Sequence, residues 1–450
     1  MSSITLLFIV IAAVVILLLL VLKLKLNAFI ALLVTSMFVG VASGMPLDNI
    51  LKSIQNGMGG TLGFVATVVG LGAIFGQMLE SSGGAESMAK YLVGKFGKDK
   101  ASWAMMLTGF FVAIPVFFDV GLIIIVPIVY SLARDSKKSV LYYGIPLLAG
   151  LAVTHSFVPP TPGPVAVAEI INANLGYVIL FGVVLGLPVA ILAGPVFGKY
   201  ISKKINVAPP DFFESHKTVE GEKLPPFGMI ISIIAVPLLL IVLNTMVDLL
   251  VKKEIIADGL FSEITGFIGH PFAALTIATL LAIYFLGTKR GFKKQEILDL
   301  STKALGPAGI IILITGAGGV FKQILIDSGI GEMLATSVAS TSLPPILLAW
   351  MVAAVIRVTQ GSATVAMITA AGLMAPLLGI FQLSEPQTAL VVIAISSGAT
   401  LLSHVNDSGF WLVGKYFGLT EKQTLQSWTV MESLIAVLGL VFTLVLSLFV

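Results

Sequence analysis

The sequence predicts an all-α polytopic membrane protein built from two repeats of inverted topology. Three observations predict this fold. Apolar stretches long enough to cross a bilayer recur along all 450 residues, only 11% of the residues are charged, and part of the first half recurs in the second. Soluble domains carry roughly 25% charged residues, and the mean hydropathy here is +1.05. The composition therefore excludes a water-soluble enzyme.

The charge balance and the absence of cysteine exclude further classes of protein. The chain has 26 Lys and Arg residues against 23 Asp and Glu residues, a net charge of +3, which does not favour nucleic acid as a partner. Because there is no cysteine, disulfides, thiolate nucleophiles and thiolate metal sites are excluded. We expect neither a metal nor a cofactor.

The first apolar stretch, residues 4–22, is predicted to be a membrane span that stays in the protein. Its length is near the ~20 residues that cross a hydrocarbon layer of ~30 Å. A secretory signal carries its positive charge before the apolar stretch, whereas Lys23 and Lys25 follow it here. We therefore interpret this stretch as the first transmembrane helix.

The remaining apolar stretches predict spans along the whole chain. They cover residues 28–44, 57–80, 102–132, 140–172, 175–200, 227–250, 270–287, 304–326, 343–380, 388–417 and 428–450. A polar segment, 202–226, contains two pairs of adjacent prolines and is predicted to be a cytoplasmic linker. It divides the chain into a first repeat, 1–201, and a second repeat, 227–450.

An internal repeat supports this division. An offset of 246 residues pairs Phe75 with Phe321 and Gln77 with Gln323, among nine identical positions of the twenty from 70 to 89. With small register shifts, the pair Thr154 and His155 corresponds to Ser403 and His404, and Gly121 corresponds to Gly361. Phe, Gln, Glu and Ser matching in one register make chance a poor explanation.

Lysine-rich loops predict how the two repeats are oriented, because such loops stay in the cytoplasm. Basic loops flank 102–132 on both sides, whereas the loops around 45–56, 327–342 and 381–387 carry almost no Lys or Arg. Lys23 and Lys25 directly follow the first span and place its end in the cytoplasm. The N-terminus is therefore expected in the periplasm.

Two of the apolar stretches are predicted to be re-entrant hairpins. One helix covering 102–132 would be ~46 Å long, more than the bilayer core. Two half-length arms that turn at 115–121 fit better, entering from the cytoplasm. The stretch 343–380 is expected to turn at 357–363 and to enter from outside. Each half then has about five spans and one hairpin, an inverted arrangement typical of transporters.

Four segments combine polar residues with helix breakers at membrane depth. They are the hairpin tip with Asp119, the segment 154–164 with its four prolines, the hairpin tip with Arg357, and the segment 403–409. Irregular backbone inside a membrane is stable where it is buried in protein or lines a watery cavity. We therefore expect the two tips and the two broken helices, 140–172 and 388–417, to converge on one cavity.

The chemistry of these segments suits a hydroxylated anion. Half-helix N-termini and an arginine bind a carboxylate, and hydroxyl and amide side chains bind its hydroxyl groups. The expected substrate-binding residues are Thr154, His155, Ser156, Thr161, Arg357, Thr359, Gln360, Gly361, Ser362, Asn406 and Ser408. A proton is carried by a group that changes charge inside the membrane, and the candidates are Asp119, His155, His404 and Asp407.

Structural roles compete with these functional ones. Arg357 can neutralise Asp119 or Asp407 as a structural pair, and His155 and His404 can donate to carbonyls at the helix breaks. Asp407 can form an Asx-type helix cap.

Four strings in the sequence resemble the gluconate permease family of bacterial secondary transporters. They are THSFVPPTPGPVAVAEIINANLGY (154–177), IPVFFDVG (114–121), VTQGSATVAMITAAG (358–372) and LLSHVNDSGFWLVGKYFGL (401–419). The resemblance implies a proton symporter for gluconate or a related sugar acid in the bacterial inner membrane. It also implies a homodimer with a scaffold domain and a mobile transport domain.

We assign the domains on that basis. The scaffold is expected to contain 4–80 and 227–326. The hairpins and broken helices, each followed by a last span at 175–200 or 428–450, are expected to form a transport domain that moves as an elevator.

Other functions stay open at this stage. Sodium coupling and a different small carboxylate, such as D-serine, are the nearest alternatives, and a channel is a further one. An enzyme is not expected, because no H-E-x-x-H, Walker or dinucleotide-binding motif is present.

Overall fold

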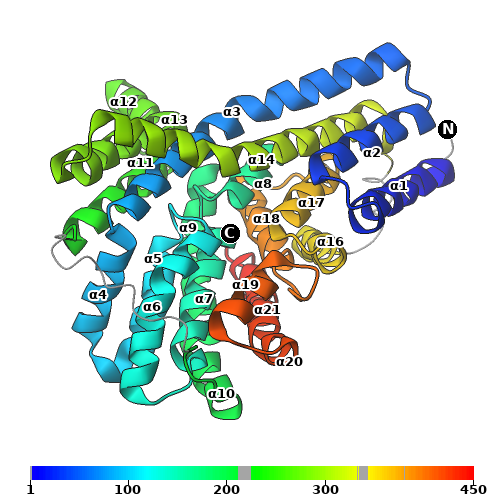
Figure 1. Ribbon diagram of the computed structural model, residues 1–450. Helices are drawn as coiled ribbons and strands as arrows, with labels where there is room; N and C mark the ends of the chain where they lie inside the picture. The colour runs from blue at the N-terminus through cyan, green and yellow to red at the C-terminus, as the bar shows by residue number, and fades with distance from the viewer. Residues whose placement is uncertain (1–2, 211–223, 332, 334–342, 380) are drawn as a thin grey trace.

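The computed structural model describes residues 3–210, 224–331, 333, 343–379 and 381–450, and within these ranges it is helical with no strand. The predicted all-α class is confirmed. The middle of the expected linker (211–223), most of the expected loop 327–342 with Glu332, and residue 380 lie outside the described residues. Figure 1 shows two long helices crossing the upper part of the molecule, with shorter helices packed below and beside them.

The two long helices are α3 (Leu47–Ser81) and α14 (Lys294–Asp327), of 35 and 34 residues. They lie side by side in opposite directions (Figure 1), and Ser53 near the start of α3 donates to the Asp327 carboxylate at the end of α14, 2.5 Å away. Their backbones come close where Gly57 faces Gly319, leaving no room for a Cβ at Gly57. This contact is the main helix pair of the expected scaffold.

The expectation that 45–56 is a loop was wrong, because α3 already begins at Leu47. The segment is polar but contains no helix breaker after Pro46. It buries Ile50, Ser53 and Gly57, at a spacing of three and four residues that places them on one helical face. The helix α4 (Gly84–Phe96) was also missed for this reason: its basic outer face resembles a loop, while Met88 and Leu92 are buried.

The first half continues with the expected hairpin and broken helix. The hairpin is α5 (Ala101–Val112) and α6 (Phe118–Ser136), and the broken helix is α7 (Leu141–Phe157) and α8 (Pro162–Ile170). At 19 residues α6 is longer than the half-membrane arm expected there. The other helices of this half are α1 (Ser3–Leu18), α2 (Ala28–Ala42), α9 (Leu175–Ile191) and α10 (Phe197–Lys204).

The second half has the same order of elements. Its hairpin is α16 (Pro345–Gln360) and α17 (Ala363–Leu378), and its broken helix is α18 (Glu385–Gly398) and α19 (Ser408–Phe417). The other helices are α11 (Phe227–Lys252), α12 (Leu260–Gly269), α13 (Pro271–Ala282), α20 (Glu421–Thr424) and α21 (Val430–Leu446). The short α12 was not expected from the sequence.

Some helix boundaries follow the 246-residue offset. The ends of α3 and α14, Ser81 and Asp327, are related by it, and so are the starts of α8 and α19, Pro162 and Ser408. The ends of α7 and α18 are closer in sequence than this offset, so the register changes near the helix breaks. The shifted pairing of Thr154 with Ser403 that the sequence suggested stays a prediction.

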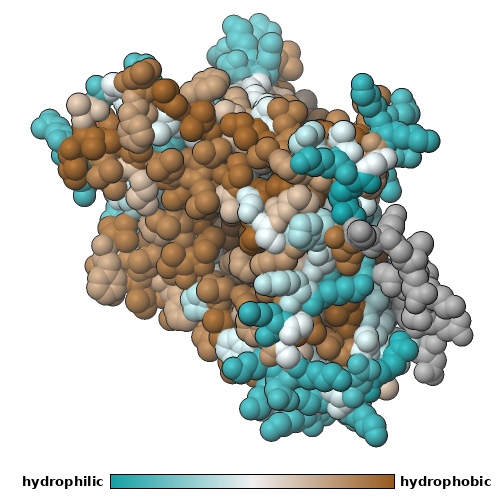
Figure 2. Space-filling view, turned by 90° about the vertical axis from the view of Figure 1, so that its left-hand side faces the viewer, coloured by the Kyte–Doolittle hydropathy of each residue, from teal (hydrophilic) through white to brown (hydrophobic). Residues whose placement is uncertain are grey.

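Seven helical stretches in the described residues are long and apolar enough to cross a membrane. They are Leu47–Ser81, Leu141–Ile170, Leu175–Lys204, Phe227–Lys252, Pro271–Arg290, Lys294–Asp327 and Glu421–Leu446. The hairpin arms α16 and α17 are among the shorter apolar helices. Figure 2 shows a broad hydrophobic surface with hydrophilic groups gathered along its edges, as expected for a protein surrounded by lipid. The protein is therefore a multi-pass membrane protein.

The broken helix of the first half lies at the centre of the packing. Nearly every residue of α7 is buried, and α7 packs closely on α5 because Gly150 faces the backbone of Met106 and Phe110. The corresponding helix α18 packs on α16, where Gly398 faces the backbone of Trp350. In both halves the first hairpin arm is thus fixed to the helix that leads into the break.

Candidate functional site

The tip of the second hairpin and the second helix break touch each other. Gly361 ends α16 with φ of +84°, a backbone conformation that favours glycine. The residue also packs against the backbone of Asn406, where a Cβ would not fit. Ser362 caps α17, and Asp407 caps α19 by accepting the amide hydrogen of Gly409 at 3.1 Å. Two polar turns are therefore held against each other among apolar helices.

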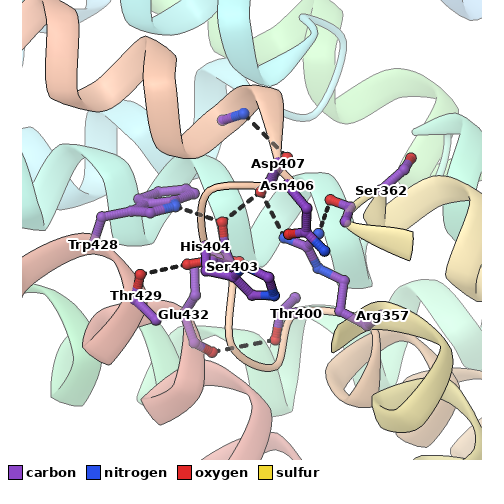
Figure 3. A network of polar contacts seen from close by, with 12 residues as sticks. Arg357, Ser362, Thr400, Ser403, His404, Asn406, Asp407, Trp428, Thr429 and Glu432 are labelled. Atoms are coloured by element: carbon purple, nitrogen blue, oxygen red, sulfur yellow. Dashed lines mark hydrogen bonds and ion pairs between the residues drawn. The ribbon is translucent and has the colours of Figure 1, made fainter. Parts of the chain in front are cut away.

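A buried ion pair joins these two turns. Arg357 Nη2 lies 2.6 Å from Asp407 Oδ2, and the two side chains are only 2% and 13% exposed. Arg357 Nη1 also donates to the carbonyl of Gly361. Figure 3 shows the guanidinium reaching from α16 to the break before α19. Because a buried charge is costly without its partner, each of these two residues keeps the other in place. Of the structural alternatives for Arg357, the structure shows the pair with Asp407.

A hydrogen-bond network extends from Asp407 to the start of α21. Ser403 donates to the Asp407 carboxylate and accepts a 2.6 Å hydrogen bond from Trp428 Nε1. Thr429 donates to the Ser403 carbonyl. Figure 3 shows these side chains in one continuous cluster. The carboxylate thus accepts hydrogen bonds from the break while it pairs with the arginine.

His404 and Asn406 lie in the same break and bond to the last turn of α16. His404 Nε2 lies 3.0 Å from the Val358 carbonyl, and Asn406 Nδ2 donates to the same oxygen at 3.0 Å and to the Thr359 carbonyl at 3.3 Å. The carbonyls at the end of a helix have no partner within it. In this conformation both side chains therefore stabilise the end of α16, as the structural alternative for His404 predicts.

The other residues predicted at the second tip differ in whether their polar atoms have hydrogen-bond partners and in how exposed they are. The Thr359 hydroxyl bonds to carbonyls of its own helix, at 3.0 Å from Val355 and 2.9 Å from Ile356. Gln360 is buried, and neither its amide nitrogen nor its amide oxygen has a partner within the described residues. Ser408 is exposed at the start of α19.

The first break is packed differently. Thr154 is fully buried at the end of α7, and neither its hydroxyl nor Nδ1 of His155 has a hydrogen-bond partner in the described structure. The Thr161 hydroxyl donates to the Val158 carbonyl at 2.7 Å, and Ser156 is buried. A cavity of about 10 Å³ separates the break from the first hairpin tip and from Gly72 of α3. That volume holds about one water molecule.

Asp119 does not join the arginine cluster. It is exposed in the first turn of α6. The neighbouring Phe118 nevertheless packs on Trp428, with ring centroids 5.4 Å apart. The two halves also meet where Gly163 of α8 faces Met367 of α17. The two halves thus touch at these points, and the charged pair belongs to the second half. The small cavity is lined by the first tip and the first break together with α3, so the convergence of all four segments on one cavity stays a prediction.

A wider pocket lies between α19 and α20. It measures about 460 Å³ and is lined by Phe410, Trp411, Gly414, Lys415, Leu419, Thr420, Glu421 and Thr424. Trp411 Nε1 donates to the Val405 carbonyl of the break at 2.9 Å, so the pocket wall is tied to the cluster. This volume is enough for a small organic anion.

Comparison with known proteins identifies the family. Residues 4–449 match the family described as GntP family permease. The chain belongs to this family. It is 42% identical over 439 residues to the gluconate permease of Bacillus licheniformis, covering 96% of each chain. It is 41% identical over 426 residues to the high-affinity gluconate transporter of Escherichia coli strain K12, covering 95% of each. It is 40% identical over 441 residues to the Gnt-II system L-idonate transporter of the same strain, covering 98% of this chain and 99% of the relative.

A solved structure is similar to this GntP family permease in fold. The Alcanivorax borkumensis YdaH transporter superposes with a TM-score of 0.62 and 16% sequence identity, covering 90% of this chain and 89% of that one. The family resemblance stated from the sequence is therefore confirmed. Because the homologues are permeases and transporters, the permease is not an enzyme.

One buried acidic residue near the arginine cluster was missed in the sequence. Glu432 on α21 is 4% exposed, and its Oε1 has no partner in the part of the chain that the structure describes. Thr400 at the break donates to its backbone carbonyl at 3.4 Å, and Figure 3 shows Glu432 beside the arginine cluster. An intramembrane carboxyl group is a functional candidate by itself. The signal available was a single Glu within the apolar stretch 428–450.

Proposed function

We propose that this permease takes up gluconate or a related sugar acid together with protons across the bacterial inner membrane. The names of the relatives support the substrate class, since they are gluconate permeases, gluconate transporters and an L-idonate transporter. The observation that carries the mechanism is the buried pair of Arg357 and Asp407 between two irregular turns. The Arg357 guanidinium is one cation that can pair first with the Asp407 carboxylate and then with a carboxylate of the substrate.

Coupling follows from charge balance at this pair. With Asp407 ionised, the guanidinium is neutralised and the site is closed to another anion. When Asp407 takes up a proton, Arg357 is left without a counter-ion, and a carboxylate of the substrate restores neutrality. One proton and one substrate carboxylate then enter together. Glu432 provides a second buried carboxyl group from which the proton can pass.

The remaining polar residues provide contacts for the substrate hydroxyl groups. Asn406, Ser408 and Ser362 lie in the two turns of the second half that hold the pair, and the Gln360 amide atoms have no partner within the described residues. The first half contributes the Thr154 hydroxyl and His155 Nδ1, which also lack a partner in that part of the chain. The other predicted contacts are Ser156, Thr161, Thr359 and the backbone of Gly361, and the other proposed proton carriers are Asp119, His155 and His404.

We assign the movement to the hairpins and breaks, with the α3 and α14 pair as the fixed part. The scaffold comprises 4–80 and 227–326, and the transport domain comprises the two hairpins, the two broken helices and the last span of each half. The common order of elements at one offset supports two inverted repeats. In this proposal two copies form a dimer through their scaffolds, and the N-terminus lies in the periplasm.

Counterflow in proteoliposomes tests the proposal. Purified permease is reconstituted, loaded with gluconate, and challenged with labelled gluconate, other aldonates or D-serine. We expect saturable exchange of gluconate, acceleration by an inward proton gradient, and no change when sodium is replaced. Exchange of D-serine alone would overturn the substrate, a sodium requirement would overturn the coupling ion, and unsaturable flux would indicate a channel.

A further inference from the structure

A second large pocket lies away from the arginine cluster, where α6 and α10 end and α7 begins. It measures about 460 Å³ and is lined by Lys137, Lys138, Ser139, Tyr142, Lys199, Ser202, Lys203 and Asn206. Four of these eight side chains are ammonium groups and none is a carboxylate. Figure 1 shows α10 beside the lower ends of α6 and α7. The proposed transport mechanism makes no use of this pocket.

The backbone around the pocket is fixed by hydrogen bonds between distant segments. Lys137 ends α6 in a left-handed conformation with φ of +55°. The buried Ser139 donates to the Ile205 carbonyl at 2.9 Å and accepts from the Val207 amide at 3.2 Å. Val140 donates its amide to the Val207 carbonyl at 2.9 Å. The turn after α6 and the segment after α10 therefore hold the lysines in place around one space.

The four lysines create a concentrated positive charge. Lys138 Nζ lies 4.1 Å from the centre of the Tyr142 ring, so this ammonium is oriented by the aromatic face. Within the described residues no carboxylate forms an ion pair with any of the four. Ammonium groups close together repel one another, and a bound anion relieves this repulsion. The chemistry of the pocket therefore suits a phosphate group, which accepts several charge-assisted hydrogen bonds.

The surface next to the pocket indicates where that phosphate comes from. Leu192 and Val196 are 37% and 52% exposed. They precede Lys199 and Lys203 in the same helical stretch at spacings of four, three and four residues, which place all four on one face. This face changes from apolar to basic toward the helix end. An acyl chain can lie along Leu192 and Val196 while its headgroup reaches the lysines.

We propose that this pocket binds the phosphate of an anionic phospholipid headgroup, such as phosphatidylglycerol, at the membrane surface. Basic pockets between transmembrane helices recognise headgroups of this kind. Since α6 is an arm of the first hairpin and α10 ends the last span of the first half, the bound lipid links these two elements. Transport and lipid binding use separate residues.

Titration of the full-length permease in detergent tests the site. Dioctanoyl-phosphatidylglycerol is the probe, and calorimetry measures its affinity. Each lysine near a phosphate contributes about 1 kcal/mol, so the double variant Lys199→Gln/Lys203→Gln is expected to bind roughly 30-fold more weakly. The matched control, Lys95→Gln/Lys98→Gln, removes the same charge from exposed positions at the end of α4 and is expected to keep the wild-type affinity.

Further arms of the experiment identify the source of the phosphate. Dioctanoyl-phosphatidylcholine is expected not to bind at the pocket, and inorganic phosphate is expected to bind far more weakly than the lipid. Equal affinity of the wild type and the pocket variant, or an equal loss in the control, would overturn the site. Inorganic phosphate binding as tightly as the lipid would overturn the lipid as ligand. An unchanged melting temperature of the lipid-free pocket variant shows that its folding is intact. Unchanged gluconate counterflow by the same variant shows that the loss of lipid binding is independent of the proposed transport function.

Discussion

The two helix breaks have the same place in their repeats but different chemistry. The first break contains four prolines and lies beside a cavity of about 10 Å³, and within the described residues the Thr154 hydroxyl and His155 Nδ1 have no hydrogen-bond partner. The second contains the Arg357 and Asp407 pair and a network of hydroxyl and indole donors, and a pocket of about 460 Å³ lies between the following helices α19 and α20. Both halves thus have a hairpin and a broken helix, while the buried ion pair lies in the second half alone among the described residues.

The largest expected effect comes from removing the cation of the second break. Arg357→Ala takes away the guanidinium for the substrate, and we expect gluconate uptake to fall at least ~100-fold, as for loss of a buried charge partner. The variant also leaves Asp407 buried and unpaired, so its melting temperature is expected to fall. Uptake by proteoliposomes and thermal unfolding measure the two effects.

A double variant separates binding from stability at this pair. Replacement of both charged residues of a buried pair by hydrophobic residues of similar volume is often neutral for stability. Arg357→Met/Asp407→Leu is therefore expected to recover the melting temperature while uptake stays absent. Normal uptake by Arg357→Ala would instead remove the arginine from the substrate site.

Next in size is the loss of coupling when the carboxylate of the second break is neutralised. Asp407→Asn cannot release a proton, so we expect counterflow to persist while accumulation driven by a proton gradient falls at least ~10-fold. The same substitution in the first half, Asp119→Asn, is expected to have the smaller effect because Asp119 is exposed. The reverse order would move the coupling group to the first half.

Glu432→Gln tests whether the buried carboxyl group beside the pair carries the proton. We expect a loss of proton-driven accumulation by roughly 3-fold to 10-fold, with the affinity for gluconate in counterflow unchanged, because the proposed role of Glu432 is proton transfer. Ser433→Ala is a neighbouring control, since its hydroxyl bonds only to the Thr429 carbonyl of its own helix. Unaltered accumulation by Glu432→Gln would leave Asp407 as the sole carrier in the second half.

The smallest expected effect is in the first break. Thr154→Val removes one unpartnered hydroxyl, and a hydrogen bond to the substrate contributes about 1 kcal/mol, so the KM for gluconate is expected to rise about 5-fold. Thr108→Val is the matched control, because that buried hydroxyl is already bonded to the Ala104 carbonyl at 2.8 Å. Equal KM values for wild type and Thr154→Val would restrict substrate contacts to the second half.

Sequence reasoning worked best where the chain departs from regular helix. Proline, glycine and polar residues within apolar stretches located both hairpin turns and both breaks, because such residues interrupt a transmembrane helix. It failed where a regular helix has a polar or basic sequence that resembles a loop. The polar first turns of α3 and the whole of α4 were interpreted as loops.

The site itself was predicted in composition but not in pairing. Arg357 and Asp407 were both candidates, yet only the fold shows that they bond to each other. Glu432 was missed because no helix breaker lies near it in α21, although it is the single Glu of the apolar stretch 428–450. Which side of a helix faces a neighbour depends on packing across elements far apart in the chain.

The length of α3 and α14 has a consequence for the surrounding membrane. Helices of 35 and 34 residues extend about 50 Å at 1.5 Å per residue, whereas the hydrocarbon layer is only ~30 Å thick. Such helices cannot stand upright entirely within lipid, so they lean or protrude. Their inclination, and the height of everything packed on them, then depends on bilayer thickness. The acyl-chain length of the lipids therefore affects the tilt of these two helices independently of any ligand.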